Sequence, residues 1–196
     1  MAGSATQAPQ IRAFTSQMAL DAIDRLPEEA GRRIREGAGD TTTLRDSLQI
    51  GWVPFEDHLR VLDSAQRVLG AEEYRRFTRQ LMLGYLERPV LRGLFETVRR
   101  VLGVTPQSLA KWSPHAWEAL FKRCGKLANE PQDRATLARV RLSGCPRECL
   151  TSGSFFESLA GSFEAIFPIT KKAGAVQVVD VDLAAGGCVF AIEWVA

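Results

Sequence analysis

The spacing of apolar residues changes near residue 135, and this change restricts the fold more than any other feature of the chain. Before it, apolar residues recur every three or four positions, which is the period of a helix with one buried face. After it, apolar and polar residues alternate, which is the period of a strand with one buried face. A helical N-terminal two-thirds followed by a small sheet predicts an α+β fold.

The alternating segments define the C-terminal module. Residues 136–142 place Ala138, Val140 and Leu142 on one face, and residues 176–183 and 188–195 have the same alternation. The segment between the first strand and the second has helical spacing. We therefore expect a β-α-β-β order over 135–196 and a mainly antiparallel sheet, whose last two strands pair as a hairpin.

The rest of the chain is expected to be one helical part of the same domain. Residues 1–14 contain many small and polar side chains and are expected to form a flexible tail. Residues 15–196 are then a single domain, with its helical part over 15–130.

Two local features locate helix boundaries within the helical part. Gly70 follows an apolar stripe and is expected to end a helix. Ser113 and Pro114 have the residue types of a helix start, because serine caps the first amides and proline suits the first helical position. The helix that begins there is expected to carry Cys124 on its last turn.

Charge and composition exclude several function classes. Lys and Arg total 25 against 23 Asp and Glu, so the formal net charge is +2, and 45% of residues are hydrophobic. This near balance argues against a nucleic-acid binder or a binder of anionic membranes. Residues 1–14 lack the pattern of a signal peptide, and no apolar run of about 18 residues is present, so we expect a cytoplasmic protein that does not enter a membrane.

No catalytic signature is present. Ser154 follows Gly153, but the G-x-S-x-G elbow of hydrolases is missing. The phosphate-binding loop, the dinucleotide fingerprint and the H-E-x-x-H zinc motif are missing as well. The sequence favours no class of enzyme.

Cys145 and Cys149 form the most unusual local pattern. Two thiols four residues apart can bind one zinc ion if the segment turns. The alternative is two small, half-buried residues in a loop between a strand and a helix. We expect no disulfide, because thiols stay reduced in the cytoplasm.

Four segments carry a resemblance to known proteins: GWVPFEDHL (51–59), residues 69–89, WSPHAWEALFKRCG (112–125) and the tail from GSFEAIF to VFAIEW (161–194). The C-terminal module resembles the superfamily of 4-vinyl-reductase and haem/nitric-oxide-binding domains, which also includes Golgi-transport subunits. More closely, the chain resembles the DUF2378 family of uncharacterised myxobacterial proteins. The resemblance implies a fold whose members sense small ligands or assemble with partner proteins.

The resemblance also bears on cofactors. Cysteine-based metal sites in 4-vinyl-reductase-like domains would add Cys124 to Cys145 and Cys149 as a third zinc ligand. The haem-binding relatives would make His115, between Trp112 and Trp117, an axial ligand. Those relatives share a Tyr-x-Ser-x-Arg clamp that this chain lacks. We therefore expect no cofactor and set haem aside.

These observations favour a non-enzymatic regulatory or sensory module, dimeric, that binds a small apolar ligand or a protein partner. The predicted site is a cleft between the helix over 112–124 and the sheet, because large side chains from three segments converge there: Trp117, Phe121, Phe156 and Trp194. Two alternatives stay open. One is a scaffold subunit with a filled core, and the other is an enzyme acting on a tetrapyrrole-like substrate.

Overall fold

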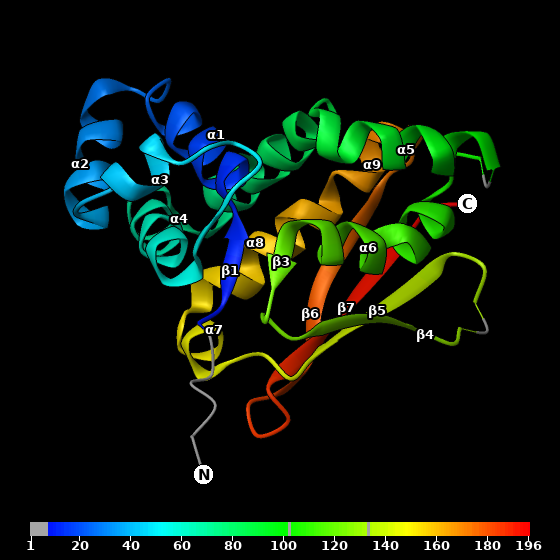
Figure 1. Cartoon of the computed structure of the whole chain (residues 1–196). Coiled ribbons are helices and arrows are strands. Elements are labelled where there is room, and N and C mark those ends of the chain that lie inside the picture. The colour runs from blue at the N-terminus through cyan, green and yellow to red at the C-terminus, as the bar shows by residue number, and fades with distance from the viewer. Residues whose placement is uncertain (1–7, 102, 133) are drawn as a thin grey trace, which may run out of the picture.

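Helices cover one face of a four-stranded sheet in the computed structural model, which describes residues 8–101, 103–132 and 134–196 (Figure 1). The helices are α1 (Ala13–Ile23), α2 (Glu28–Ala38), α3 (Thr42–Asp46), α4 (Phe55–Leu86), α5 (Pro89–Val101), α6 (Pro106–Leu120), α7 (Arg147–Thr151), α8 (Gly153–Glu164) and α9 (Ile166–Thr170). The strands are β1 (Gln10–Arg12), β2 (Trp52–Pro54), β3 (Phe121–Lys122), β4 (Lys126–Glu130), β5 (Leu137–Ser143), β6 (Gly174–Asp182) and β7 (Gly187–Trp194). The predicted α+β class is confirmed.

The larger sheet has the strand order β4-β5-β7-β6, and every neighbouring pair is antiparallel. β6 and β7 pair as the predicted hairpin, with Val178 opposite Phe190, and β5 places Val140 on the other side of Phe190. Phe190 is fully buried and its ring centre lies 5.1 Å from that of Phe163 on α8. The alternating pattern therefore marks the sheet face against which α8 packs. β4 is an additional strand that the sequence did not predict.

A second, smaller sheet joins three distant segments in the order β2-β1-β3. Ile11 of β1 lies opposite Val53 on one side and Phe121 on the other, and it is 2% exposed. The expected flexible tail over 1–14 is therefore wrong at its C-terminal end, because β1 and the start of α1 lie within it. Residues 1–7 of that tail lie outside the described residues.

α6 is one helix where the sequence predicted a new start at Ser113 and Pro114. Proline has no amide hydrogen, so Pro114 cannot donate to the carbonyl of Ala110 one turn earlier. The Ser113 hydroxyl donates to that carbonyl instead, with an Oγ–O distance of 2.8 Å. The helix then ends at Leu120, so Cys124 lies beyond β3 and not on a last helical turn.

α4 and α8 approach each other closely at Gly161. A Cβ atom at this position would overlap Thr78 Oγ1 and would lie 2.7 Å from the carbonyl oxygen of Arg75. The Arg75 guanidinium donates to Glu157 of α8 (Nε–Oε2 2.6 Å) and to the carbonyl oxygen of Val176 on β6 (3.0 Å). One side chain of α4 therefore connects α8 and the sheet.

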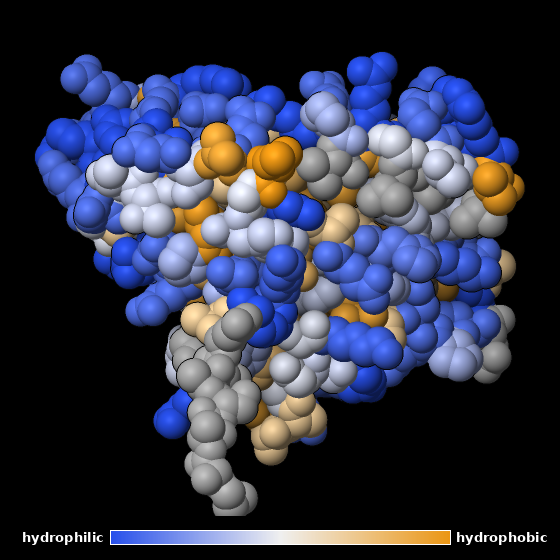
Figure 2. All heavy atoms as spheres, in the orientation of Figure 1, coloured by the Kyte–Doolittle hydropathy of each residue, from blue (hydrophilic) through white to orange (hydrophobic). Residues whose placement is uncertain are grey.

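The apolar side chains lie mostly inside this arrangement. Figure 2 shows a face on which hydrophilic residues predominate and hydrophobic residues are scattered. Among the described helices, none combines the length and the hydropathy needed to span a membrane.

The backbone of α4 bends at Gly70, where the sequence predicted a helix end. Gly70 has φ 76° and ψ 170°, a conformation that side-chain-bearing residues avoid. The space where a Cβ would stand is empty, so the constraint comes from the backbone itself.

We predict that Gly70→Ala lowers the free energy of unfolding by about 1–3 kcal/mol, because alanine is strained at this φ and ψ. Gly93→Ala in α5 is the matched control, since a Cβ there also meets open space and glycine weakens a helix interior. The control should raise stability by about 0.5–1 kcal/mol. Chemical denaturation measures both, and equal effects of the two substitutions would contradict the assignment of strain to Gly70.

Candidate functional site

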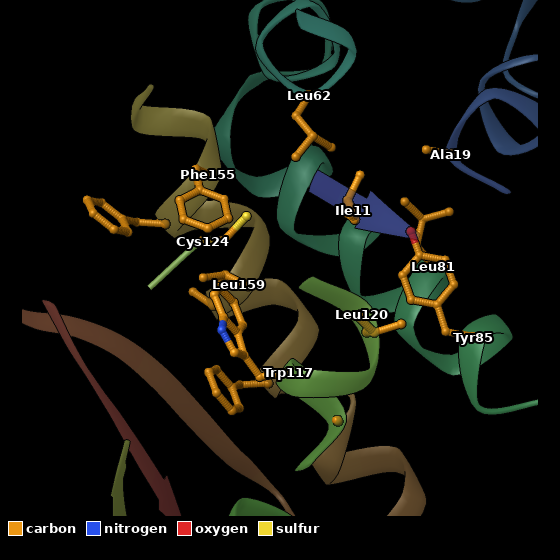
Figure 3. Close-up of a cluster of buried hydrophobic side chains, with 14 of the residues drawn as sticks. Ile11, Ala19, Leu62, Leu81, Tyr85, Trp117, Leu120, Cys124, Phe155 and Leu159 are labelled. Atoms are coloured by element: carbon orange, nitrogen blue, oxygen red, sulfur yellow. The ribbon is translucent and has the colours of Figure 1, made fainter. Parts of the chain in front are cut away.

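An apolar cavity of about 90 Å³ lies among α4, α5, α6, α8 and α9. Met82 enters it from α4, Trp117 from α6, Leu159 from α8 and Ile166 from α9. Figure 3 shows Trp117 next to Leu159, with Leu120 on the side towards Tyr85. Because its walls come from segments distant in the chain, the cavity exists only in the assembled fold.

Trp117 forms a fixed wall of this cavity. Its ring stacks on that of Phe121, with 4.0 Å between the centres and 21° between the planes. Its Nε1 donates to the carbonyl oxygen of Gly125 at 3.2 Å, and the residue is 5% exposed. Both the ring and the nitrogen of Trp117 are therefore held by the protein.

The polar groups of the cavity wall already have protein partners. Ser113 Oγ donates to the carbonyl of Ala110, and Ser162 Oγ donates to the carbonyl of Ser158 at 2.8 Å. Among the described residues that line the cavity, none is charged. The cavity therefore offers van der Waals contact and little hydrogen bonding, which suits an apolar occupant.

The structure divides the predicted site residues into two pairs. Trp117 and Phe121 line the cavity. Phe156 does not line this cavity and packs beside Phe155, with 5.8 Å between the ring centres. Trp194 lies at the end of β7 opposite Gly174, away from the lining.

The cavity lies between α6 and other helices, where the sequence predicted a cleft between a helix and the sheet. From the larger sheet only Leu127, of β4, belongs to the described lining. Phe163 and Phe190 pack between α8 and the sheet. The lining residues Met82 and Leu159 were not predicted as site residues, because helical spacing shows that a face is buried and not which face it meets.

A second cavity of about 50 Å³ adjoins the first and contains a buried histidine, His58. His58 is 5% exposed, and its Nδ1 lies 3.0 Å from Ser16 Oγ of α1. Burial lowers the pKa of His58 to about 4 because the surroundings do not solvate an imidazolium. The side chain is therefore neutral at pH 7.

We predict that His58 makes the fold less stable as the pH falls from about 6.5 to 4. In that range the unfolded imidazole takes up a proton and the folded one does not, so protons favour the unfolded state. The loss amounts to about 3 kcal/mol and levels off below pH 4. Denaturation at a series of pH values should show this loss of stability in the parent chain. The control His115→Gln should show the same loss, because His115 is exposed. It should be missing in His58→Gln, and parallel curves for the parent and His58→Gln would refute the prediction.

Three cysteines come together from separate segments. Cys145 Sγ donates to the carbonyl oxygen of Cys124 at 3.3 Å. Hydrogen bonding to the thiols of Cys124 and Cys145, together with burial, raises the pKa of Cys149 well above its ordinary value. All four cysteines, Cys188 included, are free and buried.

The zinc hypothesis for Cys124, Cys145 and Cys149 stays a prediction. Within the described part of the chain, no group of three or more His, Cys, Asp or Glu side chains is arranged to hold a metal ion. A bound metal would require these thiols to lose their protons. Elemental analysis of the parent chain and of Cys149→Ser tests the hypothesis.

No family model and no curated protein matches the sequence. Solved structures do match its fold. A variant of the Fe(II) unliganded H-NOX protein from K. algicida has a TM-score of 0.65 at 12% identity, and the match covers 94% of this chain and 97% of that one. A variant of the T. tengcongensis H-NOX domain has a TM-score of 0.63 at 12% identity, with coverages of 94% and 97%.

A third match is an oxygen-binding H-NOX domain related to soluble guanylate cyclases, in its oxygen complex, with a TM-score of 0.61 at 10% identity and coverages of 94% and 95%. The chain has the H-NOX fold. This is the fold that the resemblance to haem/nitric-oxide-binding domains implies. The closer resemblance to DUF2378 is not confirmed, since no family model matches.

The H-NOX fold corrects the expectation about cofactors. We expected no cofactor and set haem aside because the Tyr-x-Ser-x-Arg clamp is missing. Solved chains of the same fold include an Fe(II) protein and a structure that concerns the modulation of haem redox potential by porphyrin distortion. The missing clamp is therefore not sufficient ground for setting haem aside.

The cavity in its present shape does not fit a haem. Its volume of about 90 Å³ is below the roughly 300–1,000 Å³ of sites for larger ligands and cofactors. Among the described lining residues, Met82 alone carries an atom of a type that ligates haem iron. His115 is exposed on α6 and does not line the cavity. A porphyrin would need Trp117 and its neighbours to move apart.

Proposed function

We propose that this chain is a ligand-sensing module that takes a small apolar molecule into the cavity walled by Met82, Trp117 and Leu159. The observation that carries the proposal is an apolar space whose polar wall groups already donate to main-chain carbonyls. An apolar cavity of about 150 Å³ in another protein stays dry and binds benzene or xenon. A space of about 90 Å³ suits a molecule of a few heavy atoms.

The position of the cavity supports a sensory role. Its walls belong to α4, α6 and α8, and α6 packs in turn against β4 and β5 of the larger sheet. A ligand that contacts all three helices stabilises the arrangement seen here. The stabilisation grows with the affinity of the ligand for this arrangement. One solved chain of the same fold is an oxygen-binding domain, which agrees with a small ligand but does not identify it.

A protein partner and the expected homodimer have less support. Among the described residues, the large apolar side chains that are exposed come from four separate parts of the chain: Leu48, Ile50, Val101, Val181, Leu183 and Val195. Scattered apolar residues of this kind are ordinary on protein surfaces and do not define an interface.

The experiment is a titration with benzene and with xenon, followed by methyl NMR. We expect saturable shifts of methyl groups that line the cavity, such as those of Leu159 and Ile166, and a higher melting temperature with benzene. Ala116→Leu should abolish the shifts, because Ala116 lines the cavity and leucine occupies its volume. Glu118→Leu is the matched control on the exposed side of α6 and should leave binding unchanged.

Two results would overturn the proposal. One is the absence of saturable shifts with both probes, and the other is equal binding by the parent and Ala116→Leu. A further experiment adds hemin to the purified chain and measures its binding from the Soret absorption band. A band at one equivalent would make the site a haem site and replace the small-molecule proposal.

A further inference from the structure

The two cavities share one layer of side chains. Five residues line both: Met82, Leu120, Phe121, Leu159 and Ser162. Methionine is unbranched and changes rotamer readily, so Met82 is the most adaptable member of this layer. The layer shared by the two cavities therefore includes one side chain that rearranges readily.

His58 has an unused hydrogen-bonding atom. Its Nδ1 is engaged with Ser16 Oγ at 3.0 Å, whereas its Nε2 has no hydrogen-bond partner among the described residues. The residue is 5% exposed and lines the second cavity. Because His58 lines this cavity, Nε2 is the ring nitrogen left for an occupant to bind.

The other polar groups that line the second cavity already have hydrogen-bond partners. Each hydroxyl group donates to a main-chain carbonyl over 2.6–3.1 Å: those of Thr15, Thr78, Tyr85, Ser158 and Ser162. No charged side chain is among the described residues of the lining. His58 is neutral, so the site offers one neutral hydrogen-bonding nitrogen beside an apolar space.

We propose that the two cavities form one site for a small neutral alcohol or phenol. Its hydroxyl hydrogen-bonds to His58 Nε2, and its apolar body lies against Met82 and Leu159. A carboxylate or an ammonium group is excluded, because the lining described above offers it no countercharge. This inference rests on the proposed function and names the chemical class of its ligand.

The experiment compares phenol with toluene, which has nearly the same shape and lacks the hydroxyl. In a purely apolar cavity phenol binds more weakly than toluene, because its hydroxyl loses water without replacement. We expect phenol to bind the parent chain at least as tightly as toluene, measured by calorimetry. His58→Leu should raise the Kd of phenol at least tenfold and leave that of toluene within twofold. His115→Leu, the matched control at an exposed histidine, should change neither.

A second measurement needs no substitution, in case His58→Leu does not fold. Phenol should shift the side-chain ¹⁵N resonance of His58 Nε2 in the parent chain, and toluene should not. The inference is overturned if toluene binds, phenol binds more weakly and Nε2 does not respond; the apolar site of the proposed function would then stand. If neither probe binds, the proposed function fails together with the inference.

Discussion

The close contact between α4 and α8 at Gly161 places the larger sheet and two walls of the cavity relative to each other. The absence of a side chain at Gly161 lets the two backbones approach until Thr78 and the Arg75 carbonyl fill the space of a Cβ. Arg75 then binds Glu157 of α8 and the backbone of β6, so the sheet is placed relative to the same two helices. Met82 of α4 and Leu159 of α8 both line the cavity, so the same contact brings two of its walls together. A larger residue at 161 would separate the walls of the site as well as the helices.

The parts of the fold that the sequence predicted are those with a local cause. Alternation over 176–195 requires a hairpin with one buried face, and Val178 and Phe190 pair as expected. Gly70 bends α4 because only glycine tolerates its torsion angles. The small sheet has no local cause, since β1, β2 and β3 are short strands whose pairing joins residues far apart in the chain. Ile11 therefore looked like part of a polar tail, although its partners bury it completely.

The sequence predicted the candidate site only as far as a large aromatic side chain indicates that a residue is buried. Trp117 and Phe121 were chosen as large aromatic residues and do line the cavity, but Phe156 and Trp194 gave the same signal and lie elsewhere. The importance of His58 depends on an atom without a partner, which no residue pattern encodes. The expectation about haem failed for a related reason, since it relied on a short motif, whereas the likeness to H-NOX domains lies in the arrangement of the whole chain.

The bend at Gly70 has a consequence for how the chain assembles. α8 lies across both halves of α4: Ser154 donates to Asp63 in the first half at 2.5 Å, and Glu157 binds Arg75 in the second half. No side chain packs at Gly70 to hold the angle between the halves, whereas α8 contacts both of them. α4 is therefore held on both sides of its bend by residues 153–164, which lie beyond the change of period near residue 135. The change of period therefore divides two patterns of sequence whose side chains bind one another directly.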